Sequence, residues 1–220
     1  MNDIKANAPV ANVPPPNAPP PSATAPLLVL ASASPRRAEL LGHLGVAFTI
    51  EPANVDESAL PNETPEGYVE RVARLKAAAG VAPDRIVIAA DTIVVLDGQV
   101  LGKPADPDEA RAMLACLSGR RHQVLTCAVV ATPNQEIVHL DRAEVSFATL
   151  TAGEIEWYVG TGDSLDKAGA YGIQGAAGLF VTELRGNLQT VIGLPMRTLL
   201  GSLRELGFDP FNNKAPNTPT

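Results

Sequence analysis

Two long strand-like segments follow each other directly in the middle of the chain, and they constrain the fold more than any other feature. Residues 123–131 and 136–149 are rich in strand-forming side chains and indicate a pair of antiparallel strands. Elsewhere along the chain helical patterns separate the strand-like runs, so strands and helices mix without strict alternation. This order predicts an α/β fold with a mixed β-sheet and flanking helices, rather than a doubly wound parallel sheet.

Local signals predict the remaining elements. Short apolar runs predict strands at 27–31, 46–50 and 85–90, the last of which ends at Asp91. Turn residues at 97–98 and 185–187 predict hairpins that join 93–96 to 99–101 and 179–184 to 188–192. Capping residues and prolines predict helices that begin near Ser34, Thr64, Asp106, Thr151 and Pro195. The apolar stripe expected on the second of these helices consists of Tyr68, Val69, Val72, Leu75 and Ala79.

The two ends of the chain differ in composition from its body. Residues 1–26 are rich in Pro, Ala and Asn and contain no aromatic residue, and residues 212–220 are similar. Segments of this kind bury too little apolar surface to offset the entropy cost of ordering them. We therefore expect a disordered extension at 1–26, one folded body at 27–211, and a disordered tail at 212–220. The extension resembles neither a secretory signal nor a transit peptide.

Charge, hydropathy and cysteine content limit the classes of binding partner and the compartment that we expect. The formal net charge is -7 and aromatic residues make up 4% of the chain, which disfavours a nucleic-acid-binding surface but still allows a local basic site for a small phosphate ligand. No apolar run is long enough to span a membrane, so we expect no membrane partner. Cys116 and Cys127 show no metal-binding spacing and are interpreted as core thiols of a cytoplasmic, reducing compartment.

A cluster of hydroxyls and guanidiniums follows the first predicted strand. Ser32, Ser34, Arg36 and Arg37 lie where that strand leads into a helix. The free N–H groups of a helix N-terminus favour an anion, and guanidiniums match phosphate oxygens. The cluster therefore suggests a phosphate site, although a capped helix with two solvated arginines remains the alternative. The spacing of a P-loop is absent.

Two acidic positions suggest a metal or a general base. Asp91, followed by Thr92, comes at the expected end of an apolar strand, and Asp56-Glu57 lies in the loop after the second strand. Strand ends commonly meet ligands, and Mg²⁺ usually takes one or two carboxylates together with substrate phosphates. The alternatives are a strand-end Asp and a solvated acidic loop.

Two lysines and a glycine-rich segment complete the set of candidates. Lys76 and Lys103 would offset phosphate charge, or are solvated surface lysines. Residues 166–175 are glycine-rich and include Gln174, whose amide offers both a donor and an acceptor to a nucleobase. A flexible connector is the alternative reading of this segment.

Taken together, these segments resemble the Maf family of nucleotide pyrophosphatases. The likeness covers about 27–206 and runs in order along the chain through Ser32–Arg37, Val55–Glu57, Lys76, Ala90–Thr92, Gly102–Pro104, Asp166–Gly175 and Gly193–Pro195. It implies an ITPase-like fold with two lobes around a deep cleft, often as a homodimer. It also implies hydrolysis of a nucleoside triphosphate to the monophosphate and pyrophosphate, with a divalent cation (Mg²⁺, Mn²⁺ or Co²⁺) as cofactor.

The resemblance also implies roles for individual residues. Asp91 matches the catalytic aspartate that takes a proton from water, and Glu57 joins it near the metal. The substrate-binding positions are Ser32, Arg36, Arg37, Lys76, Thr92, Lys103 and Gln174, of which Arg36, Thr92 and Gln174 match selectivity positions. Ala90-Asp91-Thr92 and Ile173-Gln174-Gly175 are typical of the branch that acts on dTTP and UTP. The alternatives are 7-methyl-GTP or deaminated purine nucleotides as substrates, or a nucleotide-binding regulator of cell division.

Overall fold

The computed structural model describes residues 26–212. The extension expected at 1–26 and the tail expected at 212–220 therefore lie, apart from Pro26 and Asn212, outside the described residues. Within residues 26–212, no helix combines the length and the apolar character needed to cross a membrane.

The described chain forms one mixed sheet, as the sequence predicts, and the sheet has seven strands. The strands are ordered β2-β1-β3-β5-β6-β7, and β4 pairs with β3 beside this path. Strand β1 runs parallel to both β2 and β3, whereas every other pairing is antiparallel. The strands are β1 Leu27–Leu30, β2 Thr49–Ile50, β3 Arg85–Leu96, β4 Gln99–Leu101, β5 Arg121–Ala131, β6 Glu136–Phe147 and β7 Val181–Arg185.

The expected capping residues begin most of the helices. Ser34, Thr64, Asp106 and Thr151 each accept a hydrogen bond from a backbone N–H of the first turn, which satisfies a donor that has no partner within the helix. The α-helices are α1 Pro35–Gly42, α2 Pro65–Gly80, α3 Pro107–Leu117, α4 Ala152–Gly160, α5 Leu188–Ile192 and α6 Met196–Glu205. Two 3-10 helices, η1 Ala168–Ala170 and η2 Ala176–Phe180, lie in the glycine-rich region.

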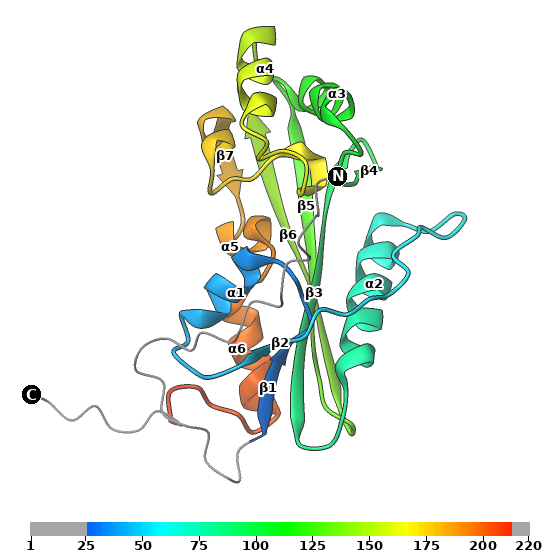
Figure 1. Cartoon of the computed structure of the whole chain (residues 1–220), viewed down its shortest axis with the longest axis vertical. Helices are drawn as coiled ribbons and strands as arrows, with labels where there is room; N and C mark the ends of the chain where they lie inside the picture. Colours follow the sequence, from blue (N-terminus) through cyan, green and yellow to red (C-terminus); the bar gives the residue numbers. More distant parts are fainter. Residues whose placement is uncertain (1–25, 213–220) are drawn as a thin grey trace, which may run out of the picture.

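The helices cover the sheet in two lobes (Figure 1). In the first lobe, α2 packs on one face of β1, β3 and β5, and α1 and α6 pack on the other. In the second lobe, α3, α4 and the 3-10 helices enclose a separate core at the far ends of β3, β5 and β6. Because β3, β5 and β6 run through both lobes, they fix the position of one lobe relative to the other.

Strand β3 is longer than its sequence suggests. The strand predicted to end at Asp91 continues to Leu96, because β5 pairs with it from Val87 to Val95. Strand β1 pairs with β3 only as far as Ile88, so Asp91 lies in mid-strand at a point that β1 has already left uncovered. The prediction that Asp91 ends a strand is therefore wrong. Asp91 is accessible to a ligand because β1 ends before it, and not because β3 ends there. Strand β2 is shorter than predicted, with only Thr49–Ile50 paired.

The buried face of α2 also differs from the predicted stripe. Leu75 is 40% exposed and Ala79 is exposed, whereas the buried residues are Val69, Val72, Ala73, Lys76 and Ala77. These positions follow the spacing of one helical face. Lys76 lies in the middle of that face, and a lysine there interrupts the apolar pattern of the sequence. Its burial indicates that it has partners inside the protein.

The last predicted hairpin does not form. Residues 188–192 are helix α5, in which Asn187 accepts a hydrogen bond from the N–H of Gln189. Gly193 ends the helix in the left-handed region at φ 117°. A short apolar run fits a strand or a helix equally well by periodicity, and here the capping residue at its start and the glycine at its end decide for the helix.

The cap of α5 leads to a test of stability. Replacing Asn187 by Ala removes the acceptor for the Gln189 N–H, and N-cap losses of this kind typically cost about 1 kcal/mol. We expect a comparable decrease in the free energy of unfolding, measured by urea denaturation. An unchanged midpoint would contradict the helical assignment of 188–192.

Candidate active site

A cleft of about 510 Å³ lies at the part of β3 that β1 leaves uncovered. Its walls come from the β1–α1 turn, α2, β3, and the glycine-rich segment 166–174. The site residues implied by the family resemblance all line it: Ser32, Arg36, Arg37, Glu57, Lys76, Asp91, Thr92, Lys103 and Gln174. Residues spread over most of the folded chain thus meet in one cavity.

Strand β3 places neighbouring polar side chains of the cleft on its two opposite faces. Successive side chains of a strand point to opposite faces, so Asp91 and Thr92 face different helices. Asp91 faces α2 and contacts Lys76, whereas Thr92 contacts Arg37 of α1. A carboxylate group and a guanidinium group therefore lie on either side of one backbone segment.

The ammonium group of Lys76 joins the two predicted acidic residues. Its Nζ lies 2.8 Å from Asp91 Oδ1 and 2.9 Å from Glu57 Oε1. Lys76 and Asp91 are 8% and 7% exposed, so the pair is held away from most of the solvent. The sequence prediction placed Lys76 at the phosphates, but the structure places it on the carboxylates. Asp91 Oδ2 and Glu57 Oε2 have no hydrogen-bond partner among residues 26–212.

Arg37 joins three separate segments around the cleft. Its Nε donates to the carbonyl of Gly193 at 2.9 Å, Nη1 donates to Ser32 Oγ at 3.1 Å, and Nη2 donates to Thr92 Oγ1 at 3.0 Å. Desolvation lowers the pKa of Arg37, and the nearby Asp91 carboxylate acts in the opposite direction. With three of its N–H groups used inside the protein, Arg37 has two left for a ligand.

A directed chain of hydroxyls extends from Arg37 into the sheet. Thr126 donates to the carbonyl of Thr190 at 2.7 Å, and it therefore accepts from Thr92, whose Oγ1 lies 2.9 Å away. Thr92 in turn accepts from Arg37. The single proton of the Thr92 hydroxyl is thus committed to Thr126, so Thr92 can meet a ligand only as an acceptor.

Lys103 and Gln174 have side chains that are free to meet a ligand. Both are exposed, and neither makes a side-chain hydrogen bond or an ion pair within the described part of the chain. Lys103 comes from the turn after β4, and Gln174 comes from the glycine-rich segment. They provide an exposed ammonium group and an exposed amide at the wall of the cleft, both available to a ligand.

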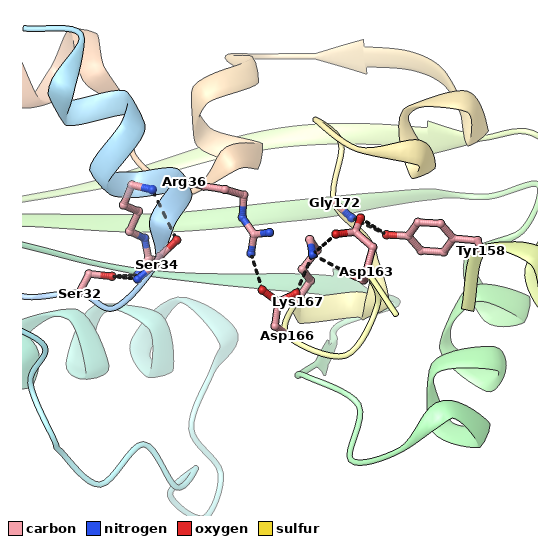
Figure 2. A network of polar contacts seen from close by, with 9 residues as sticks. Ser32, Ser34, Arg36, Tyr158, Asp163, Asp166, Lys167 and Gly172 are labelled. Atoms are coloured by element: carbon pink, nitrogen blue, oxygen red, sulfur yellow. Dashed lines mark hydrogen bonds and ion pairs between the residues drawn. The ribbon is translucent and has the colours of Figure 1, made fainter. Parts of the chain in front are cut away.

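Arg36 connects α1 to the glycine-rich segment (Figure 2). Its Nη2 lies 3.6 Å from Asp166 Oδ2, and the Nζ of Lys167 donates to Asp166 Oδ1 at 2.6 Å. The cleft is thereby bridged from the first lobe to the second. Five basic and three acidic side chains line the cleft, so it carries a local positive excess in a chain whose formal net charge is -7.

Several lining or supporting residues escaped sequence analysis. Tyr68 lines the cleft from α2, although its position suggested only an apolar stripe. Thr126 and Asp163 do not line the cleft but form hydrogen bonds with residues around it, and no local sequence pattern predicts these bonds. Asp56, the neighbour of Glu57, does not line the cleft, and its carboxylate accepts from the N–H of Ser58 instead.

A buried histidine supports the wall without adding charge. His122 is 2% exposed, and its Nε2 lies 2.7 Å from the hydroxyl of Tyr171, which lines the cleft. Desolvation lowers the pKa of His122 to about 4, so the imidazole is neutral at pH 7. The charge of the cleft therefore comes from its lysines, arginines and carboxylates alone.

Comparisons with known proteins identify relatives of this chain. Residues 27–206 match the family model described as Maf-like protein. The dTTP/UTP pyrophosphatase of Anaeromyxobacter dehalogenans is 55% identical over 188 residues, which cover 84% of this chain and 96% of that protein. The dTTP/UTP pyrophosphatase of Pseudoalteromonas atlantica is 49% identical over 176 residues, with 77% and 92% covered. Among solved structures, the Ham1 protein of Staphylococcus aureus gives a TM-score of 0.42 at 19% identity over 55% of this chain and 71% of that one.

Proposed function

The chain belongs to the Maf family, and from this premise we propose that it hydrolyses dTTP and UTP to the nucleoside monophosphate and pyrophosphate. The observation that carries the proposal is the convergence in one cleft of a buried carboxylate, Asp91, with the basic residues suited to a triphosphate. The choice of dTTP and UTP rests on the names of the relatives, and the choice of reaction is supported by the groups that line the cleft.

We infer that Asp91 is the general base. Water attacks the α-phosphorus, a new P–O bond forms, and the bond between that phosphorus and the bridging oxygen breaks. The proton of the water passes to Asp91, and pyrophosphate leaves with the electron pair of the broken bond. A carboxylate placed for this transfer contributes about 10²–10⁴-fold to the rate. Lys76 holds Oδ1 of Asp91 and leaves both lone pairs of Oδ2, one for the proton of the water and the other for a cation.

A divalent cation fits the two carboxylates. Asp91 Oδ2 and Glu57 Oε2 are the oxygens left without a partner, and Mg²⁺ usually takes one or two carboxylates and completes its shell with water and phosphate oxygens. When bound, the cation would offset charge that develops on the phosphates. We therefore propose that pyrophosphate release is lost on treatment with a chelator and restored by Mg²⁺, Mn²⁺ or Co²⁺.

We propose that the basic residues hold the triphosphate while Gln174 reads the base. Arg36, Arg37 and Lys103 meet phosphates that every substrate shares, and Arg36 is also proposed as a selectivity position together with Thr92 and Gln174. The amide of Gln174 pairs with O4 and N3–H of uracil or thymine, where cytosine presents the opposite pattern of donor and acceptor. Thr92 is a further proposed selectivity position, and it can contribute only as an acceptor.

Both cysteines are free thiols, which supports the reducing cytoplasm as the proposed location. Only Cys127 is buried, whereas Cys116 is exposed on α3, so the expectation of a core thiol is wrong for Cys116. A homodimer is also proposed, on the basis of family resemblance alone.

The test of the function is pyrophosphate release from a panel of nucleoside triphosphates. We expect dTTP and UTP to be the best substrates, ahead of CTP, 7-methyl-GTP and ITP. A preference for 7-methyl-GTP or ITP would favour the same reaction on another base. Tight binding without turnover of any nucleotide would favour a nucleotide-binding regulator instead.

Lys103 offers a test of the phosphate assignment. Replacing Lys103 by Ala should lower kcat/KM by about tenfold, the value of one charge-assisted hydrogen bond, and should do so equally for UTP and CTP. Arg197→Ala is the matched control, because Arg197 is also exposed and unpaired among the described residues but lies on α6, away from the cleft. A change in the UTP/CTP ratio of the Lys103 variant would show that Lys103 contacts the base.

A further inference from the structure

The backbone next to Gln174 packs directly on two charged side chains. A Cβ at Gly172 would lie 2.5 Å from Lys167 Cε, and one at Gly175 would lie 2.7 Å from Asp163 Oδ2. Real Cβ atoms do not approach other atoms so closely, so a side chain at either position would displace Lys167 or Asp163. The segment that carries Gln174 is therefore seated on Lys167 and Asp163, and its position depends on where these two side chains are held.

A buried tyrosine fixes Asp163 and the loop at the same time (Figure 2). The hydroxyl of Tyr158 donates to Asp163 Oδ2 at 3.0 Å and accepts from the N–H of Gly172 at 3.1 Å. Tyr158 is completely buried within the core of the second lobe, so its hydroxyl has a fixed position. The backbone of the loop is thus attached to a rigid part of the protein through one phenol group.

Lys167 fixes the opposite side of Asp163. Its Nζ donates to Asp163 Oδ1 at 2.6 Å, to the carbonyl of Asp163 at 2.5 Å and to Asp166 Oδ1 at 2.6 Å. All three donors of the ammonium are therefore used inside the protein, and none is left for a phosphate. Lys167 is 7% exposed, whereas the side chain of Asp163 is 37% exposed, so the pair has its ammonium inside the protein and its carboxylate at the edge.

The same network reaches the phosphate side of the cleft. Arg36 meets Asp166 Oδ2, so the residue proposed to bind phosphate and the loop proposed to read the base share one set of contacts. The network contains two basic residues, Arg36 and Lys167, and two acidic residues, Asp163 and Asp166. Its charges balance, as a partly buried network requires.

We propose that Asp163 and Tyr158 are positioning residues for base selection: together with Lys167 they set the position of the loop that presents Gln174. This inference rests on the proposed function, because it assumes that Gln174 reads the base. Neither Asp163 nor Tyr158 lines the cleft, so both act through the loop rather than on the substrate.

The first test is Tyr158→Phe, which keeps the buried ring and removes only the hydroxyl. The N–H of Gly172 and Asp163 Oδ2 then lose their shared partner. We expect amide hydrogen exchange in peptides that cover 169–176 to become about tenfold faster. We also expect the UTP/CTP ratio of kcat/KM to fall about 5- to 10-fold, through a higher KM for UTP with kcat within about twofold of wild type.

The second test is Asp163→Asn. The amide can still accept from Tyr158, but its NH₂ group faces Lys167 and cannot accept from the ammonium. This variant separates the contribution of Lys167 from that of Tyr158, and it should change the UTP/CTP ratio in the same direction. Asp108→Asn is the matched control, since Asp108 pairs with Arg111 on the surface of the same lobe without contacting the loop. The control should leave the ratio at its wild-type value.

Base selection and structural support give different results. An equal loss of kcat/KM for UTP and CTP would show that the network only supports the fold, and would overturn the proposal, as would an unchanged ratio in Tyr158→Phe. If Asp163→Asn does not fold, Tyr158→Phe decides alone, with its melting temperature as the check on folding. Should the wild-type protein release no pyrophosphate from either nucleotide, the proposed function fails, and the ratio of dissociation constants for UTP and CTP tests the positioning role in its place.

Discussion

Replacing Asp91 by Asn is expected to lower pyrophosphate release from UTP by about 10²–10⁴-fold, the typical contribution of a general base. Asn keeps the shape of the side chain but cannot take the proton of the attacking water at neutral pH. It also removes the charge that Lys76 now balances, although Lys76 keeps its contact with Glu57. Steady-state release of pyrophosphate from UTP is the measurement.

The Asp91 variant must be shown to fold before its activity is interpreted. Its circular dichroism spectrum and melting temperature should stay close to those of the wild type, because the side chain lies beside the cleft and keeps its volume. Asp209→Asn is a suitable control, since Asp209 pairs with Arg204 outside the cleft and should leave turnover unchanged. Near-wild-type turnover by a well-folded Asp91 variant would remove Asp91 from the reaction.

Replacing Gln174 by Ala should reduce the preference for UTP over CTP by roughly 5- to 150-fold, which corresponds to about 1–3 kcal/mol for polar groups left without a partner. The amide is exposed at the cleft and has no partner among the described residues, so its removal costs little stability. Specificity constants for both nucleotides in the two proteins are the measurement.

The effect at Gln174 must be separated from a general loss of activity. Gln135→Ala is the matched control, because Gln135 lies in the turn between β5 and β6 and contacts only Glu205 with its amide. It should alter neither the rates nor their ratio. If the ratio stays at its wild-type value in the Gln174 variant, Gln174 does not read the base and the assignment of the loop fails.

Elements with strong local signals were predictable from the sequence. The mixed sheet follows from the adjacent strands β5 and β6, and the helix starts at Ser34, Thr64, Asp106 and Thr151 follow from capping chemistry. The glycines and the amide of the segment 166–175 indicated close approach to a ligand, and the structure places that segment at the cleft. In each case a few neighbouring residues carry the whole signal.

Features that depend on distant partners were not predictable. The end of β3 was misplaced because its length is set by pairing with β5, which is remote in sequence. The sequence predicts Lys76 at the phosphates, since its contacts with Glu57 and Asp91 arise only when α2 packs on β3. The sequence predicts a strand at α5, because a segment of five residues is too short for its apolar positions to separate the strand period from the helix period. The roles of Thr126 and Asp163 likewise exist only in the folded chain.

The most direct test of the account is to identify the products formed from UTP and to repeat the assay with dTTP, CTP, 7-methyl-GTP and ITP. The account predicts UMP and pyrophosphate in equal amounts, with dTTP and UTP giving the highest kcat/KM of the set. Formation of UDP and phosphate would contradict it, because attack would then fall on the γ-phosphorus. A higher kcat/KM for 7-methyl-GTP or ITP than for UTP would contradict the assignment of the substrate.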